Sequence, residues 1–198
     1  MLKKIISALF LMLPFLLVQG QANYFYPNKG NFDASIPTPE QFLGYAIGEQ
    51  HTRHDRIVAY LKELDRLSDK VSFEIIGETF ERRAQVVAIF SSPENHKNIE
   101  QIRLQHLSNQ TNGTNKVPLV IHLAYNVHGN EPSSSEAALL TAYYLTASQS
   151  EQTKEGLNNM IITLDPVINP DGRDRHTHWA NMHKGTPPVA DPNDREHN

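Results

Sequence analysis

Apolar side chains recur every three or four residues between His54 and Leu67, and this spacing predicts one amphipathic helix. After this segment the period changes, because apolar and polar residues alternate from Val71 to Ile75, as they do in a half-buried strand. Residues 84–90 are rich in Val and Ile and predict a second strand. The connection between the two strands is short, so we expect them to pair antiparallel.

The second half of the chain combines further helical and strand-like segments. Residues 93–107 are expected to form a helix, and the polar stretch 108–116 a loop. Residues 119–124 form a short continuous apolar run, which is typical of a strand buried on both faces. His122 falls within this run, so we interpret it as a hydrogen-bonded core residue. A further apolar run at 160–168 predicts another strand.

The segment between these two apolar runs decides the fold class. Residues 133–147 predict a helix, and Ser133 and Glu136 match a capping box at its start. A crossover of this length with one helix makes the flanking strands parallel. We therefore predict an α/β fold with a mixed, largely parallel sheet and helices on both faces. The carboxyl ends of the parallel strands share one edge of the sheet, where open α/β folds bind ligands.

The first 22 residues have the composition of an export signal. Lys3 and Lys4 precede the apolar run Ile5–Val18, and Ala22 is a small residue suitable for cleavage. The run is short for a membrane span, so we expect a cleaved signal peptide rather than a stable membrane anchor. We therefore predict a secreted or periplasmic protein. The absence of cysteine excludes a disulfide framework and favours bacterial export.

The remaining residues divide into two parts. Residues 23–50 are rich in Pro, Gly and aromatic side chains without a clear period, and we expect an extended lead-in. Residues 51–198 are expected to belong to one folded domain, since 39% of the chain is hydrophobic and 20% is charged. The net charge of −4 provides no basic surface, so nucleic acid is not expected as a partner.

Two unusual polar segments follow the two parallel strands. His128 and Glu131 follow the first strand, and Gly129 between them is expected to allow a sharp turn. A neutral imidazole and a carboxylate are both good zinc ligands. The His-x-x-Glu spacing alone is common, but its place at the ligand-binding edge favours a metal site over a solvated loop histidine. Residues 169–172, Asn-Pro-Asp-Gly, follow the second strand, so both loops are expected to converge.

Together these motifs resemble the zinc carboxypeptidase family, the relatives of pancreatic carboxypeptidase A. In that family a His-x-x-Glu pair supplies two zinc ligands, and an Asn-Pro-Asp-Gly turn follows a few tens of residues later. The segment Gly77–Arg83 is similar to the family's Gly-x-Thr-x-Glu-Gly-Arg segment, with Arg82 in place of the usual Gly. The resemblance runs from Thr52 to Arg175 and is carried by the motifs in combination.

The resemblance implies a zinc-dependent carboxypeptidase that cleaves peptide or protein substrates with a metal-activated water. It implies His128 and Glu131 as two of three zinc ligands, while the third ligand and the glutamate base are expected beyond Asn198. The chain is therefore expected to be the N-terminal part of a catalytic domain, incomplete at its C-terminus and inactive alone. Arginine should hold the oxyanion or the substrate carboxylate, and Arg173 and Arg175 are the nearest candidates.

Other polar residues near these motifs have simpler interpretations. His176, His178 and His183 match no ligand of the family, and we expect surface or supporting roles for them. Asp171 is expected to stabilise its own turn. Glu136 is expected to serve as a capping-box partner rather than as a catalytic base.

Two other functions stay open from the sequence. A zinc amidohydrolase of the aspartoacylase and succinylglutamate desuccinylase type also carries a His-Gly-Asn-Glu run, as residues 128–131 do. A non-catalytic domain or fragment is the second alternative, because a catalytic zinc site needs three protein ligands and a water. The Asn-Pro-Asp-Gly turn and the Gly77–Arg83 segment favour the carboxypeptidase.

Overall fold

The computed structural model of the protein describes residues 25–26, 31–112 and 116–184. Within these ranges no helix is both long enough and apolar enough to cross a membrane. The predicted signal peptide, residues 1–22, lies outside them. Export of the protein therefore stays a prediction.

The described residues form one mixed sheet and several helices. In chain order the elements are α2 (Pro39–Leu43), α3 (His54–Leu67), β1 (Val71–Glu78), β2 (Ala84–Phe90), α4 (Pro93–Lys97), α5 (Ile99–Asn112), β3 (Leu119–Ala124), α6 (Pro132–Ala147), α7 (Glu151–Asn159), β4 (Met160–Asp165) and α8 (Pro170–Met182). The predicted segments 54–67, 84–90 and 119–124 agree with α3, β2 and β3 at both ends.

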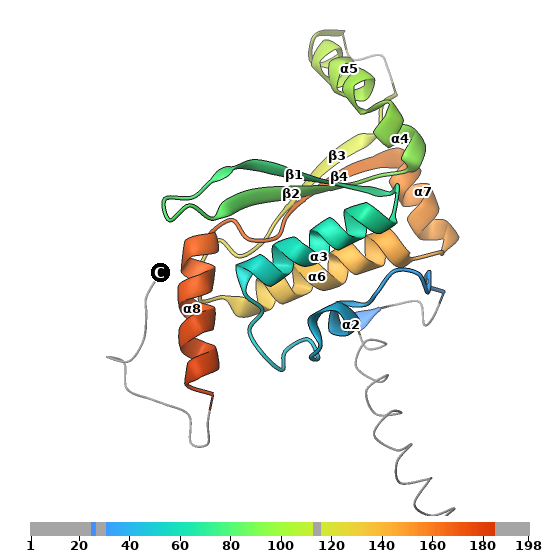
Figure 1. Cartoon of the computed structure of the whole chain (residues 1–198). Helices are drawn as coiled ribbons and strands as arrows, with labels where there is room; N and C mark the ends of the chain where they lie inside the picture. The colour runs from blue at the N-terminus through green and yellow to red at the C-terminus, as the bar shows by residue number, and fades with distance from the viewer. Residues whose placement is uncertain (1–24, 27–30, 113–115, 185–198) are drawn as a thin grey trace, which may run out of the picture.

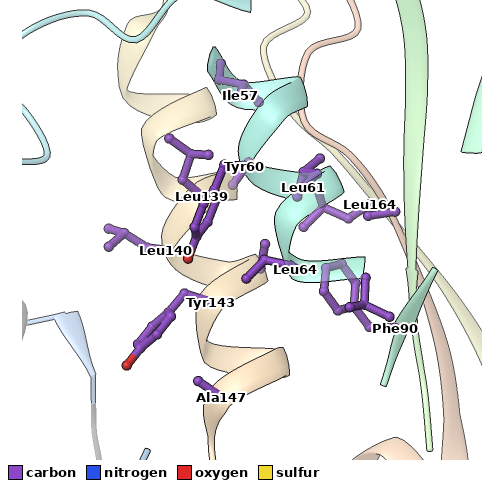
Figure 2. Packing of buried hydrophobic residues seen from close by; sticks show 14 of the residues in the cluster. Ile57, Tyr60, Leu61, Leu64, Phe90, Leu139, Leu140, Tyr143, Ala147 and Leu164 are labelled. Atoms are coloured by element: carbon purple, nitrogen blue, oxygen red, sulfur yellow. The ribbon is translucent and has the colours of Figure 1, made fainter. Parts of the chain in front are cut away.

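Helices α3 and α6 lie side by side against one face of the sheet (Figure 1). Figure 2 shows their interface, to which α3 contributes Leu61 and Leu64 and α6 contributes Leu139. Phe90 of β2 and Leu164 of β4 reach the same cluster from the sheet, and all five side chains are fully buried. Removal of this apolar surface from water is the main stabilising contribution to the fold. The apolar stripe that predicted α3 is thus the face that packs into the core.

The strand order is β1-β2-β4-β3, and the three pairings differ in direction. β1 and β2 are antiparallel, as predicted, and β2 also pairs antiparallel with β4. β3 and β4 are parallel from Leu119–Met160 to Ala124–Asp165, which confirms the predicted parallel pairing, although the crossover contains two helices, α6 and α7, instead of the one predicted. The mixed α/β fold is confirmed, but among the described strands parallel pairing is the minority. The crossover from β3 to β4 supplies the single parallel pairing. The β1–β2 hairpin adds two antiparallel pairings, one between its own strands and one between β2 and β4.

Strand β3 lies at the edge of the described sheet rather than at its centre. Leu119 is 59% exposed and Val120 is 50% exposed. The prediction of a strand buried on both faces is therefore wrong for the described residues, because none of them pairs with its outer edge. His122 is likewise exposed instead of lying in the core, and its Nδ1 is 2.8 Å from Thr163 Oγ1 on β4.

The second face of the sheet is covered only in part. Helix α5 lies on the opposite side of the sheet from α3 and α6 (Figure 1), so helices do occupy both sides. A groove of about 440 Å³ remains between α5 and the strands. Its apolar lining comes from Ile89, Val120 and Ile161 of the sheet and from Ile99 and Ile102 of α5.

Several helices depart from the predicted pattern for local reasons. The single helix predicted at 93–107 is two helices, because the chain breaks at Asn98, whose Nδ2 donates to Glu94 O at 2.9 Å. Helix α5 then continues through most of the predicted polar loop. The polar helices α7 and α8 have too few apolar residues to reveal a period. Asn169 begins α8, since its Oδ1 accepts from Gly172 N at 2.9 Å.

The lead-in segment is less extended than predicted, because it contains helix α2. That helix starts with a capping box, in which Thr38 Oγ1 accepts from Gln41 N and Thr38 N donates to the Gln41 side chain. Tyr26 is buried, and its ring stacks on Tyr144 of α6 at a centroid distance of 6.0 Å. The described part of the lead-in is therefore packed into the same core as α6.

Candidate metal centre

The turns that follow β3 and β4 are hydrogen-bonded to each other. Tyr125 N donates to Asp165 O at 3.0 Å, and Ile168 N donates to Tyr125 O at 2.9 Å. Asn169 N then donates to Asn126 O at 3.2 Å. These bonds continue the parallel pairing past the strand ends, so the two polar segments lie together at the carboxyl edge of the sheet.

The two turns also touch backbone to backbone. A Cβ atom on Gly129 would lie 1.9 Å from the carbonyl carbon of Gly172 and 2.4 Å from the amide nitrogen of Arg173. Such distances are far inside van der Waals contact, so no residue with a Cβ fits at residue 129 in this arrangement. Gly129 does not have a positive φ. Close approach, rather than the sharp turn predicted, is therefore the reason for glycine here.

His128 and Glu131 present metal-binding atoms to each other. His128 Nδ1 lies 3.2 Å from Glu131 Oε1, and the two side chains are 63% and 59% exposed. Zinc bonds of about 2.0–2.1 Å at a tetrahedral angle would place two ligand atoms about 3.3 Å apart. The spacing and the donor types therefore fit two ligands of one zinc ion that is accessible from solvent.

The described residues do not add a third ligand to this pair. Across residues 25–26, 31–112 and 116–184 no group of three or more His, Cys, Asp or Glu side chains could hold a metal ion. The ring of His176 lies edge-on to His51 at a centroid distance of 5.1 Å, and burial lowers the pKa of both. The ring of His183 stacks on Trp179 at 4.9 Å. These histidines of α8 and its C-cap are thus engaged in other contacts.

Arg173 is completely buried, which does not agree with the prediction that it binds substrate. Its Nε donates to Thr52 O at 2.9 Å and its Nη1 donates to Pro132 O at 3.0 Å. Its Nη2 donates to Glu136 Oε1 at 2.7 Å. Burial lowers the pKa of Arg173, and the Glu136 carboxylate opposes this shift. A substrate could reach this guanidinium only if these buried bonds were broken.

Glu136 is a buried partner of Arg173 rather than part of a capping box. Thr52 N and Thr52 Oγ1 donate to its two carboxylate oxygens at 2.8 and 2.9 Å. Helix α6 has Glu131 as its N-cap residue, without a side-chain cap bond, so the predicted capping box at Ser133 is wrong. The sequence pattern could not reveal the actual partners, because they lie 84 and 37 residues away in the chain.

Asp171 bonds to the β1–β2 hairpin rather than to its own turn. Its Oδ1 accepts from Thr79 Oγ1 at 2.7 Å and from Arg83 Nη1 at 2.8 Å. Its Oδ2 accepts from Glu81 N at 3.2 Å. Burial alone would raise the pKa of Asp171, but these hydrogen bonds outweigh it and the pKa is lowered. The Gly77–Arg83 segment and the start of α8 therefore form one polar contact.

The backbone conformation at Arg82 accounts for the glycine that the family's similar segment usually has at this position. Its φ is 64°, in the left-handed region that favours glycine. Its Nη1 donates to Glu78 Oε2 at 3.1 Å across the turn. The hairpin thus keeps the turn geometry expected of the motif although the glycine is replaced.

Arg175, the other predicted substrate-binding residue, is accessible. Its side chain is 44% exposed and its Nη2 donates to Glu81 Oε1. It lines a cavity of about 220 Å³ together with Arg53, Asp174 and other residues of the hairpin and α8. Of the two predicted arginines, Arg175 alone can therefore meet a ligand without unfolding its surroundings.

Gly129→Ala should destabilise the protein, because the added methyl group overlaps the backbone of Gly172. We expect a loss of about 1–3 kcal/mol in the free energy of unfolding, measured by urea denaturation. Gly77→Ala is the matched control, since a Cβ there meets nothing within 4 Å, and we expect a change within about 0.5 kcal/mol. Equal stability of the two variants would show that the turns do not pack as described.

Arg173→Ala should cost about 3–5 kcal/mol of unfolding free energy, because it leaves the Glu136 carboxylate buried without its cation. Arg175→Ala, two residues along the same helix, removes an exposed ion pair and should destabilise the protein far less than Arg173→Ala. Thermal and urea unfolding of both variants measure the difference. A larger loss for Arg175→Ala would contradict the described burial.

A comparison with protein families identifies one match. The model of the family described as zinc carboxypeptidase matches residues 57–193, which is more than half of the chain. The matched range contains His128, Glu131 and the Asn-Pro-Asp-Gly segment. None of the curated proteins matches.

Several solved structures are similar at low identity. Carboxypeptidase A from Helicoverpa armigera is 21% identical, with 82% of this chain and 33% of that chain covered and a TM-score of 0.49. A metallo-carboxypeptidase from Burkholderia cenocepacia is 17% identical, with 65% and 30% covered and a TM-score of 0.46. Bovine thrombin-activatable fibrinolysis inhibitor, in complex with tick carboxypeptidase inhibitor, is 19% identical, with 69% and 35% covered and a TM-score of 0.43.

The chain spans about a third of the length of these structures. Their identities and TM-scores are too low to add to the assignment, which rests on the family match. The chain belongs to the zinc carboxypeptidase family.

Proposed function

We propose that the protein is a secreted or periplasmic metallocarboxypeptidase that hydrolyses peptide bonds near the C-terminus of peptide or protein substrates. The observation that carries this proposal is the 3.2 Å approach of the His128 imidazole to the Glu131 carboxylate at the carboxyl edge of the sheet. Membership of the zinc carboxypeptidase family supports the reaction class.

His128 and Glu131 would hold Zn²⁺ through a nitrogen and an oxygen, which are donor types that zinc prefers. When bound, the ion supplies a Lewis acid that activates water and polarises a carbonyl group. Arg175 is the accessible arginine that would bind a substrate carboxylate, to which the planar guanidinium is suited. Arg173 would instead keep Pro132, the residue after Glu131, in place.

The general base and the third zinc ligand are proposed to lie beyond Asn198, in a longer protein. Among the described residues no third His, Cys, Asp or Glu side chain joins His128 and Glu131 in a group that could hold a metal ion. A catalytic zinc site uses three protein ligands and keeps one position for water. The 198-residue chain by itself is therefore proposed to be inactive.

In the full-length protein, His128→Ala and Glu131→Ala should each abolish zinc retention, because each removes one ligand of the same ion. Zinc content after gel filtration, measured by atomic emission, checks this. His122→Ala is the control, since it removes an exposed histidine of β3 outside the turn and should leave the zinc content unchanged. Full zinc content in either ligand variant would remove the basis of the proposal.

The full-length protein should shorten unstructured peptides from the C-terminus, and Glu131→Ala should not. Mass spectrometry of the products over time measures this. The alternative, a zinc amidohydrolase, is favoured only by the His-Gly-Asn-Glu run at residues 128–131. Release of amino acids from N-acylated amino acids without peptide shortening would support that alternative and contradict the carboxypeptidase.

A further inference from the structure

Asn126 has an unusual backbone conformation beside the proposed metal ligands. Its φ is 55°. Among the described residues other than glycine, Asn126 and Arg82 are the two that have a positive φ. Unlike Arg82, which is exposed, Asn126 is only 2% exposed. Asparagine tolerates the left-handed region better than most residues, but the conformation still needs support from its surroundings.

The side chain of Asn126 holds both ends of the ligand turn. Its Nδ2 donates to His128 O at 2.8 Å and to Glu131 O at 3.0 Å. Glu131 N donates to the same His128 carbonyl at 3.0 Å. One carboxamide nitrogen therefore ties together the main chains of the two residues whose side chains form the proposed zinc site.

The backbone of Asn126 is fixed as well. Its N–H donates to Ser134 Oγ on α6 at 2.8 Å, and its carbonyl accepts from Asn169 N, the N-cap residue of α8, at 3.2 Å. The main chain of Asn126 is thus anchored to α6 and to the start of α8. Its Oδ1 is buried and has no hydrogen-bond partner within the part of the chain that the structure describes. Within that part of the chain, the Asn126 side chain acts only as a hydrogen-bond donor, through its two N–H groups.

We infer that Asn126 is a positioning residue of the zinc site, which fixes the turn that aims His128 and Glu131 at one ion. The inference rests on the proposed function of that pair. The exposed side chains of His128 and Glu131 contact each other and little else, so the main chain of the turn decides where the pair points. Polar groups that orient metal ligands in this way raise metal affinity without contacting the metal.

Only a side chain with two N–H donors on a short stem can make these bonds. Aspartate has nearly the same shape and tolerates the left-handed region, but its carboxylate accepts hydrogen bonds and cannot donate to two carbonyls. Glycine relieves the backbone conformation and also removes both donors. Aspartate removes the donors but keeps a non-glycine residue in the left-handed region, whereas glycine removes the donors and the backbone strain together. A loss of zinc affinity in both variants is therefore due to the lost donors.

The experiment compares Asn126→Asp and Asn126→Gly in the full-length protein with the wild type. The control is Asn181→Asp near the C-terminal end of α8, which changes a carboxamide whose Nδ2 donates to His51 O at 2.9 Å. Three quantities are measured: the zinc dissociation constant by chelator competition, amide hydrogen exchange of residues 126–131 without zinc, and the thermal midpoint without zinc.

We expect both Asn126 variants to bind zinc about tenfold or more weakly and to exchange faster in the turn, while Asn181→Asp changes neither. The Asp variant is decisive, because its added negative charge would by itself favour zinc. Zinc binding that requires His128 but is unchanged in both Asn126 variants would overturn the inference and leave the proposed function intact. A lower thermal midpoint of Asn126→Gly, which adds no buried charge, in proportion to its loss of affinity would overturn it in favour of a general folding role. A wild-type protein that does not bind zinc would overturn both proposals.

Discussion

The contact between Gly129 and the backbone of Gly172 is the constraint on which the edge of the sheet depends. It lets the turn after β3 lie directly on the first residues of α8, where any Cβ would collide with the main chain. The Asn169–Asn126 hydrogen bond joins the same two segments, and the buried Arg173 directly follows Gly172. The turn that carries His128 and Glu131 is thus fixed by backbone packing, while their exposed side chains contact each other at 3.2 Å.

Charged residues around this edge serve mainly to join segments that are distant in the chain. Arg173 and Glu136 form a buried pair that, with Thr52, joins α8, α6 and the segment before α3. Asp171 holds the β1–β2 hairpin through Thr79 and Arg83. A buried pair with satisfied hydrogen bonds fixes one arrangement strongly, because removal of either partner leaves a charge without compensation.

Two of the three motifs that carry the family resemblance are therefore in direct contact. The Gly77–Arg83 segment reaches the Asn-Pro-Asp-Gly segment through the Asp171 carboxylate. This contact places Glu81 where it pairs with Arg175, which stays partly exposed beside the cavity. The structural role of the hairpin motif also accounts for the left-handed backbone of Arg82, because the turn must bend sharply to present Thr79 and Arg83.

The sequence by itself determined α3 from its apolar period, the strands from alternating or continuous apolar runs, and the parallel pairing of β3 with β4. It also predicted that His128 and Glu131 lie together, because their spacing and their place after a strand are local properties, and their role as zinc ligands stays a prediction. Only the tertiary structure decided the roles of Glu136, Arg173, Asp171 and Asn126. Their partners lie in other elements, and local pattern does not report which distant groups share a desolvated site. The exposure of β3 was decided in the same way, since an apolar run shows that a strand can be buried but not which neighbours cover it.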